Sequence, residues 1–257
     1  MFARRGTDPR IELKDETAQE LMRRAGRVTA LTFVKLREMI LPGITTAELD
    51  ALAEKTIRGM GAIPAFLHYG GFPATACISI NEVVVHGIPG PAILREGDIV
   101  GIDLGSIFDG WYSDATYTYP VGKVSAEAQM LIEIGKGALA AGIAAAQPGK
   151  RIRDIGAAVQ NFAESRGASV VRDLCGHGVG RNLHEKPEIP NYPTRMGNIE
   201  ILPGMTLAIE PMLNAGRPEV IMLDDGSFRT LDNSISVHFE HTVLIRADGP
   251  EILTVIR

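Results

Sequence analysis

Two aspartates eleven residues apart, Asp103 and Asp114, are the first side chains whose surroundings suggest chemistry. Residues 99–102 are apolar and mostly β-branched, which predicts a buried strand that ends at the Asp103 carboxylate. The turn signal Asp109-Gly110 follows, so a returning strand would bring Asp114 beside Asp103. Neighbouring carboxylates raise each other's pKa unless a multivalent cation lies between them. We therefore interpret this hairpin as half of a metal site.

An internal repeat predicts the other half of the site. Residues 97–103 align with residues 204–210 at an offset of 107, so Glu210 corresponds to Asp103. Asp114-Ala115-Thr116 likewise resembles Glu240-His241-Thr242. Two similar halves that face each other would place all four carboxylates at their seam. Each carboxylate lies in an apolar stretch, where an unpaired charge is costly, so we expect them to share bound cations.

One imidazole completes this candidate site. His177 is flanked by glycines in the segment Cys175-Gly176-His177-Gly178, and glycine allows close approach of the backbone. Four carboxylates with a single nitrogen suit Mn²⁺, Fe²⁺ or Co²⁺ better than a closed structural zinc site. Two divalent ions would balance four negative charges, and ions about 3.5–4 Å apart can activate a bridging water for hydrolysis.

The elements that would position these residues occur in the same order in both halves. Apolar periodicity predicts a helix over residues 15–40, and a capping box of Thr45 and Glu48 begins a second helix that ends at Gly61. Ser125 would cap a third helix to about residue 146, and a fourth would end at Gly167. Residues 63–118 and those from 170 onward have the pattern of short strands and turns. We expect an α+β fold in which pseudo-symmetric halves, roughly 15–121 and 122–257, form a single catalytic domain over 1–257.

Composition restricts the partners and the compartment. The net charge of −5 gives no electrostatic reason to expect DNA or an anionic membrane as a partner. The N-terminal segment lacks the apolar core of a signal peptide, and the longest weakly polar run, residues 138–146, is short for a membrane span. The two cysteines, Cys77 and Cys175, form no CxxC motif and are typical of buried thiols in a reduced compartment. We expect a cytoplasmic protein.

Five motifs make the chain similar to the type I methionine aminopeptidases. They are residues 77–89 (CISINEVVVHGIP), the pair Asp103 and Asp114, GHGVGR at 176–181 followed by His184-Glu185, IEPM at 209–212, and FEHT at 239–242. The resemblance extends from about residue 13 to residue 257. It implies the pita-bread fold of prolidase and creatinase, a curved antiparallel sheet with helices on its outer face. It also implies removal of the N-terminal methionine from nascent proteins and peptides whose second residue is small.

The resemblance implies a role for each metal-binding position. Asp103 would bind one ion through both oxygens, and Asp114 and Glu240 would bridge the two ions. His177 and Glu210 would complete the other ion, and Glu210 would also accept a proton from the attacking water. The ions themselves would be Co²⁺, Mn²⁺, Fe²⁺ or similar.

Further roles follow from the same resemblance. His86 would lie near the scissile amide nitrogen and assist proton transfer, and His184 would contact the substrate and orient its carbonyl. Without the resemblance, His86 is best interpreted as a core or turn histidine and His184 as a surface residue. The implied methionine pocket is formed by Phe66, Tyr69, Phe72, Cys77 and Leu183. The resemblance also implies a structural Na⁺ or K⁺ ion at Asn81, Val83 and Ser236.

Two positions depart from the family pattern. Relatives usually have tryptophan after the Asp-Gly turn, where this chain has Ser227. They usually have glutamine two residues before the bridging glutamate, where this chain has His238. On a strand His238 and Glu240 share a face, so a further imidazole would approach the metal site.

Other functions of the same fold remain open on sequence alone. A proline-specific peptidase or a creatinase-like hydrolase usually carries an additional N-terminal domain, for which this chain has no room. A type II methionine aminopeptidase usually carries a helical insertion, whereas Glu210 and Glu240 are thirty residues apart. A non-catalytic adaptor would have lost ligands, and all five positions here keep ligating side chains. We expect a monomer that acts on peptide and nascent-protein N-termini, and contact with the ribosome is left open.

Overall fold

The computed structural model describes residues 8, 10–195 and 197–256. Residues 1–7, part of the segment in which the sequence predicts no signal peptide, lie outside the described residues. The elements in chain order are α1 (Glu16–Met39), α2 (Thr46–Gly59), β1 (Ile63–Pro64), the 3-10 helix Tyr69–Gly71, β2 (Ala76–Ile80), β3 (Val83–Val85), β4 (Ile99–Phe108), β5 (Trp111–Pro120), α3 (Ala126–Ala145), α4 (Ile152–Glu164), β6 (Ser169–Val170), β7 (Cys175–Gly178), β8 (Glu185–Pro190), β9 (Thr206–Ile209), β10 (Met212–Asn214), β11 (Val220–Met222), β12 (Phe228–Thr230), β13 (Ser236–His238), β14 (Glu240–Arg246) and β15 (Gly249–Ile252).

A nine-stranded antiparallel sheet forms the centre of the molecule. Its main order is β1-β4-β5-β14-β9-β7-β8, with β2 paired to β4 and β15 paired to β14. Strand β5 of the first half pairs directly with β14 of the second, through Thr116 with Glu240 and Ala115 with His241. The sheet therefore runs without interruption across the seam between the halves.

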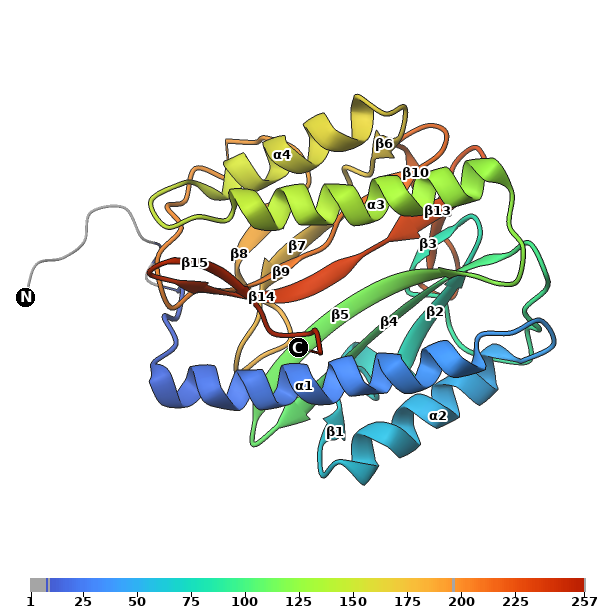
Figure 1. Cartoon of the computed structure of the whole chain (residues 1–257), viewed down its shortest axis with the longest axis horizontal. Coiled ribbons are helices and arrows are strands. Elements are labelled where there is room, and N and C mark those ends of the chain that lie inside the picture. Colours follow the sequence, from blue (N-terminus) through green and yellow to red (C-terminus); the bar gives the residue numbers. More distant parts are fainter. Residues whose placement is uncertain (1–7, 9, 196, 257) are drawn as a thin grey trace, which may run out of the picture.

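The four α-helices lie on one face of this sheet (Figure 1). Helices α1 and α2 pack on strands of the first half through a core that includes Leu36, Leu49 and Ile102. Helices α3 and α4 pack on strands of the second half through a core that includes Ile155 and Phe239. Each pair of helices thus buries the helix-facing side chains of its half, as the repeat in the sequence predicts, and the opposite face is left for the site.

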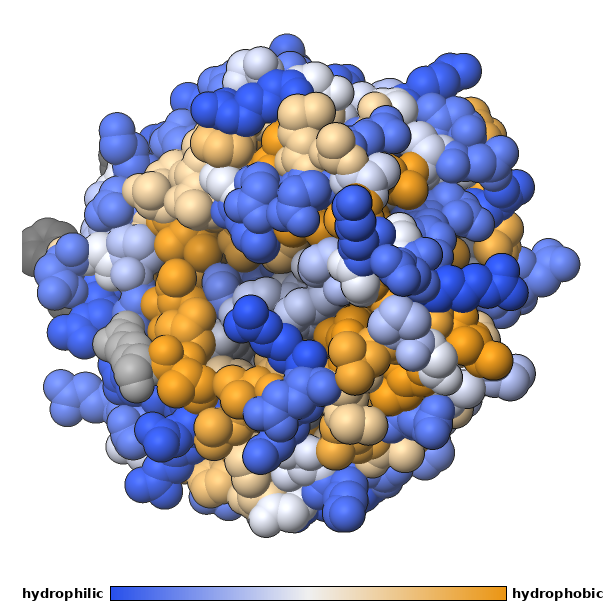
Figure 2. Space-filling model, turned by 45° about the vertical axis from the view of Figure 1, so that its right-hand side comes forward, coloured by the Kyte–Doolittle hydropathy of each residue, from blue (hydrophilic) through white to orange (hydrophobic). Residues whose placement is uncertain are grey.

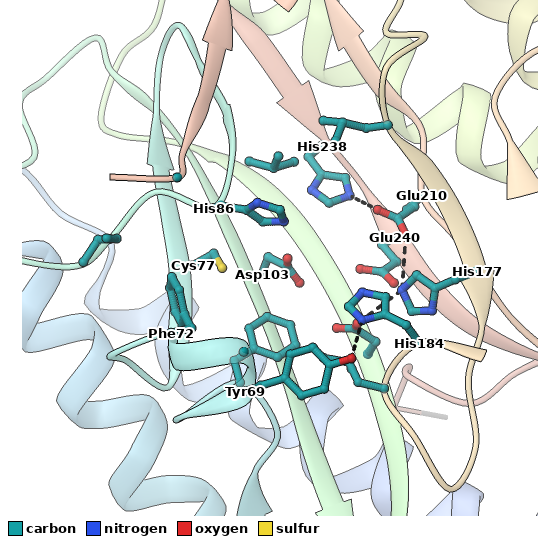
Figure 3. A pocket seen from close by; sticks show the side chains of 18 of the residues that line it. Tyr69, Phe72, Cys77, His86, Asp103, His177, His184, Glu210, His238 and Glu240 are labelled. Carbon is teal, nitrogen blue, oxygen red and sulfur yellow. Dashed lines mark hydrogen bonds and ion pairs between the residues drawn. The ribbon is translucent and has the colours of Figure 1, made fainter. Parts of the chain in front are cut away.

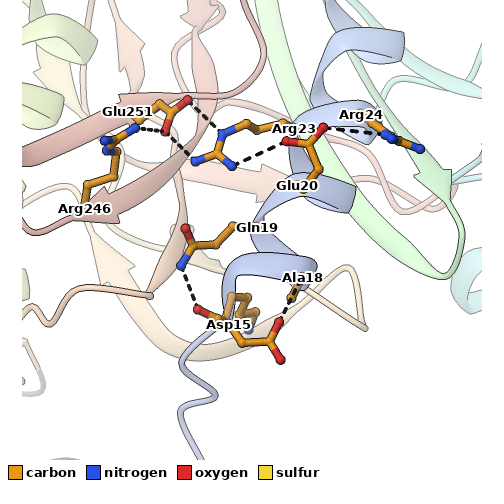
Figure 4. Close-up of polar contacts among 9 residues, drawn as sticks. Asp15, Ala18, Gln19, Glu20, Arg23, Arg24, Arg246 and Glu251 are labelled. Atoms are coloured by element: carbon orange, nitrogen blue, oxygen red, sulfur yellow. Dashed lines mark hydrogen bonds and ion pairs between the residues drawn. The ribbon is translucent and has the colours of Figure 1, made fainter.

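Side-chain caps mark the starts of the first three helices. Asp15 accepts a hydrogen bond from the Ala18 amide at the start of α1 (Figure 4). Thr45 and Glu48 form a reciprocal capping box at the start of α2, and Ser125 caps α3. These caps satisfy amide groups that have no partner within the helix, so the predicted helix starts are confirmed.

Helix α1 is also joined to the last strand of the sheet, β15, by an ion pair. Arg23 donates two hydrogen bonds of 3.0 Å to the Glu251 carboxylate on β15, and Arg246 approaches the same carboxylate at 3.3 Å (Figure 4). Glu251 is only 9% exposed. A bidentate arginine contact of this kind joins the first helix to the last strand.

Strand β4 differs from the expected hairpin in one respect. It was expected to end at Asp103, but it continues to Phe108, so the carboxylate lies in the middle of a ten-residue strand. Burial alternates from Val100 to Leu104, with Ile102 and Leu104 buried in the helix-side core. Asp103 therefore points away from the helices without ending the strand.

Helix α3 is more apolar than the short run at residues 138–146 suggests. By length and composition alone its residues Ala126–Ala145 could cross a membrane, and half of that window is buried inside the protein. A helix packed on a core passes the same test, so this finding is weak evidence for a span. Elsewhere on the surface, apolar side chains form separate patches divided by polar ones on the face that Figure 2 shows.

Candidate metal centre

Pairing between three strands brings the first carboxylates together. Asp103 on β4 lies opposite Thr116 on β5, and Thr116 lies opposite Glu240 on β14. Asp114 precedes Thr116 by two residues and so projects from the same face of β5. Three carboxylates from both halves thus share one side of the sheet, opposite the helices.

Glu210 and His177 reach the same place from the neighbouring strands. Glu210 directly follows β9, whose last residue Ile209 lies opposite His241 on β14, and His177 on β7 lies opposite Ala208. The His177 Nε2 atom is 3.4 Å from Glu210 Oε1 and 3.8 Å from Asp114 Oδ2 (Figure 3). The structure brings all five residues that the sequence singled out to one site.

The glycines around His177 are required by close backbone contact. A Cβ atom on Gly176 would lie 2.3 Å from the Ala208 carbonyl oxygen, and one on Gly178 would lie 2.3 Å from the Lys186 carbonyl oxygen. The His177 Nδ1 atom is 2.9 Å from the Gly178 carbonyl oxygen, to which it can only donate. The Nε2 lone pair is therefore free to face the carboxylates, which is the arrangement of a metal-ligating histidine.

Burial shifts the pKa of every titratable group in this cluster. It raises the pKa of Asp103 to about 6, and it raises the pKa values of Asp114, Glu210 and Glu240 well above their usual range. Neighbouring carboxylates add to the shifts of Asp114 and Glu240. Burial lowers the pKa of His177 to about 3, so this imidazole is neutral at pH 7 and can act as a ligand.

The cluster has unused donor atoms of the kind a divalent cation needs. Among the described residues, Asp103 Oδ1, Asp114 Oδ1 and Glu240 Oε1 are buried without a hydrogen-bond partner. Ligand atoms of Asp114, His177 and Glu240 all lie within 4.8 Å of one another. Orphaned carboxylate oxygens are unfavourable in a protein interior, and a bound cation would compensate them. The residues present therefore fit a divalent-metal site.

A cavity of about 570 Å³ opens onto this cluster. All seven residues predicted to contact the substrate line its wall: Phe66, Tyr69, Phe72, Cys77, His86, Leu183 and His184. The predicted monovalent-cation residues do not line it. There, the Ser236 amide donates to the Asn81 carbonyl oxygen, and Val83 begins the neighbouring strand β3.

The two predicted catalytic histidines border the cavity from separate loops. His86 follows β3 in a left-handed backbone conformation, with φ of 62°, and its ring meets the Phe228 ring edge-on at 5.9 Å. The His184 ring meets the His177 ring edge to face with centroids 4.3 Å apart, and the Tyr69 hydroxyl is 2.8 Å from His184 Nδ1 (Figure 3). Both histidine side chains are accessible to a bound molecule.

Several cavity residues were not predicted from the sequence. They come from distant loops and strands: Gly70, Gly71, Pro73, Val85, Ile88, Leu174, Cys175, Met212, Asp225 and Gly226. Cys175 precedes His177 by two residues on β7, so strand alternation alone would have placed it on the same face. Ser227 is buried at 3% exposure and holds Asp225 through its amide and hydroxyl, so its neighbours rather than its own side chain form the wall.

Comparison with known proteins assigns the chain and its fold to a family. The family model for metallopeptidase family M24 matches residues 20–247. The chain belongs to this family. A methionine aminopeptidase from Clostridium perfringens is 47% identical over 248 residues, which is 96% of this chain and 100% of that protein. Membership in M24 supports the use of divalent metal, which the buried group of Asp114, His177 and Glu240 could hold.

Solved structures of M24 proteins extend the comparison. A methionine aminopeptidase from Thermotoga maritima aligns with a TM-score of 0.94 at 40% identity and covers 96% of this chain and 100% of its own. A prolidase from Pyrococcus furiosus aligns with a TM-score of 0.78 at 25% identity, and only 66% of its chain is covered. The pita-bread fold predicted from the sequence is confirmed, as is the resemblance to the type I enzymes.

Proposed function

We propose that this M24 protein is a metallo-exopeptidase that removes the N-terminal methionine from peptides and nascent proteins whose second residue is small. One observation carries the proposal: a buried cluster of four carboxylates and a neutral imidazole opens onto a largely apolar cavity. The relatives that match over nearly the whole chain are named as methionine aminopeptidases, which supports the same substrate.

The metal centre in this proposal holds two divalent ions, of Co²⁺, Mn²⁺, Fe²⁺ or a similar metal. Asp103 would hold one ion, Asp114 and Glu240 would bridge both, and His177 and Glu210 would complete the other. When bound, such ions supply Lewis-acid activation of a water and of a carbonyl. A Na⁺ or K⁺ ion at Asn81, Val83 and Ser236 belongs to the same proposal.

The side chains around the centre would handle protons and orientation. Glu210 is only partly buried, at 12% side-chain exposure, and would accept the proton of the attacking water. His86, on the opposite cavity wall, would donate to the departing amide nitrogen. His184 would orient the scissile carbonyl, and the Tyr69 hydroxyl bonded to Nδ1 would hold the His184 ring in place.

The cavity wall would supply specificity for methionine. Phe66, Cys77 and Leu183 are each less than 10% exposed and pack as one apolar cluster, with Phe72 against them. Burying an unbranched thioether there would contribute roughly 1.5–3 kcal/mol. An apolar pocket separates side chains of similar size by only about 1–3 kcal/mol, so we expect moderate discrimination against leucine.

The proposal also includes the domain organisation, the oligomeric state, the compartment and the partners of the protein. The halves at roughly 15–121 and 122–257 would act as one catalytic domain over residues 1–257, as a monomer in the cytoplasm. Its substrates would be peptide and nascent-protein N-termini, with or without the ribosome, and its partners would include neither DNA nor membrane. The unbroken sheet across the seam supports a single domain.

A peptide panel tests this function. Chelated protein is reloaded separately with Co²⁺, Mn²⁺ or Fe²⁺, and kcat/KM is measured for Met-Ala-Ser, Leu-Ala-Ser, Pro-Ala-Ser, Met-Trp-Ser and acetylated Met-Ala-Ser. We expect Met-Ala-Ser to be the best substrate and the acetylated peptide to resist cleavage. Preferred cleavage of the proline or acetylated peptide would overturn the proposal, and a protein that binds no metal and cleaves nothing would be an adaptor.

A further inference from the structure

The backbone of His238 is bound on both sides by one threonine hydroxyl. His238 is the last residue of β13, and its backbone amide donates to Thr118 Oγ1 at 3.0 Å. The same hydroxyl donates to the His238 carbonyl oxygen at 2.9 Å. Both contacts are made by the backbone, which leaves the imidazole free to project into the cavity (Figure 3). Because His238 is only 4% exposed, its ring nitrogens cannot rely on bulk water.

The two oxygens of Glu210 face two different imidazoles. Oε1 is 3.4 Å from His177 Nε2, and Oε2 is 3.3 Å from His238 Nε2 (Figure 3). His177 cannot donate through Nε2 while its Nδ1 proton is directed at the Gly178 carbonyl. Oε1 and His177 Nε2 are thus two acceptors that face each other, and both could ligate a cation bound between them. Oε2 lies on the other side of the carboxylate and is in contact with His238.

A proton on His238 Nε2 is the simplest way to satisfy this second contact. Among the described residues Nε2 is buried and has no hydrogen-bond partner by strict geometry, and Glu210 Oε2 is the acceptor facing it. If Nε2 instead carried its lone pair, two acceptors would meet in a site with little water, which is unfavourable. A small rotation would turn the 3.3 Å contact into a regular hydrogen bond.

We propose that His238 is a positioning residue that donates its Nε2–H to Glu210 Oε2. The bond holds the Glu210 carboxylate so that Oε1 alone is presented beside His177. This inference rests on the proposed metallopeptidase function, because Glu210 is taken as a metal ligand. Removing a residue that orients a ligating carboxylate typically lowers the metal affinity by about 10–100-fold.

Three variants separate this role from a general effect on the strand. His238→Leu keeps an apolar side chain of similar volume but removes the donor. His238→Gln supplies an amide donor that can reach the same oxygen. Val237→Ala is the matched control, because Val237 lies on the same strand but is buried in the core on the helix side. If His238→Leu does not fold, His238→Asn replaces it, since its shorter amide cannot span the distance.

The measurement is the dissociation constant of each Co²⁺ ion, obtained by chelator competition without substrate. We expect His238→Leu to raise the dissociation constant of at least one Co²⁺ ion by about 10–100-fold. His238→Gln should stay within a few-fold of the unmodified protein, and Val237→Ala should change stability but not Co²⁺ affinity. Unchanged affinity in His238→Leu, or equal losses in the leucine and glutamine variants, would overturn the proposal.

Proton NMR of the Co²⁺-loaded protein distinguishes positioning from direct ligation. A ligating imidazole gives a strongly shifted exchangeable N–H signal, so positioning predicts that His177 supplies this signal and that it survives in His238→Gln. A second such signal that disappears in His238→Gln would show that His238 binds the ion itself and would contradict the proposal. Peptide cleavage is measured in parallel, so failure of the methionine aminopeptidase function is seen independently of the metal affinities.

Discussion

A buried lysine outside the set of metal-binding residues offers the most direct test of the structural reasoning. The Lys14 side chain is 2% exposed, and its Nζ lies 2.6 Å from Glu185 Oε2. Nζ also donates to the Glu12 carbonyl oxygen at 3.2 Å. Glu185 has an 11% exposed side chain and accepts one further hydrogen bond, from the Asn182 amide at 3.1 Å. The pair therefore anchors the N-terminal segment to the loop that carries Leu183 and His184.

Replacing Lys14 with methionine should be strongly destabilising. The variant keeps most of the side-chain volume but leaves the Glu185 carboxylate with a single amide donor in a nearly dry site. Removing one partner of a buried ion pair costs about 3–5 kcal/mol, and the slight exposure of Glu185 favours the lower value. At a slope of about 3 kcal/mol per molar urea, a loss of about 3 kcal/mol would lower the unfolding midpoint by about 1 M.

The assay is reversible urea unfolding of metal-free protein, followed by fluorescence or circular dichroism. The control is Lys136→Met, because Lys136 and its partner Glu133 are both more than half exposed. That exposed pair should contribute less than about 1 kcal/mol. The double variant Lys14→Met, Glu185→Gln should regain much of the lost stability, since no buried charge remains unpaired. The reasoning fails if Lys14→Met and Lys136→Met unfold at the same urea concentration.

Three further predictions concern the site and the packing. Asp114→Ala should abolish binding of at least one metal ion by calorimetry and nearly all peptide cleavage, and retained activity would refute its role. His86→Ala should lower kcat by about 10²–10⁴-fold while metal content measured by elemental analysis stays unchanged. Gly26→Ala should destabilise the protein by about 1–3 kcal/mol in urea, because its Cβ would lie 2.3 Å from the Leu253 carbonyl oxygen. Gly59→Ala, with open space around it, is the matched control and should be neutral or slightly stabilising.

Local sequence signals were sufficient to predict the helices and their caps. Thr45 with Glu48 and Ser125 act within three residues of the helix start, so their effect can be predicted without knowledge of the rest of the chain. The four carboxylates were located by the internal repeat, which reflects a symmetry of the fold. Family resemblance was needed for His86 and His184, because neither residue type nor spacing distinguishes His86 from a core or turn histidine or His184 from a surface histidine.

Tertiary contacts explain what the sequence could not predict. Asp103 was expected at the end of its strand because a carboxylate normally terminates an apolar run. Strand β4 continues because Ile102 and Leu104 stay in the helix-side core, while Asp103 faces the cavity together with Asp114 and Glu240. The contact between Tyr69 and His184 joins residues 115 positions apart and has no local signal. The same holds for Leu174 and Met212, which reach the cavity only because distant strands meet there.

The continuous pairing of β5 with β14 constrains how molecules enter and leave the site. The two halves are joined beside the metal centre by backbone hydrogen bonds between β5 and β14. The Thr242 hydroxyl adds two bonds, since it donates to the Asp114 carbonyl oxygen and accepts from the Asp114 amide. Opening the halves like the lobes of a hinged enzyme would break this ladder. Substrate and product must therefore pass through the mouth of the cavity, where Tyr69, Gly70 and Asp225 are exposed. The rate at which the freed amino acid departs should depend on these rim loops rather than on movement between lobes.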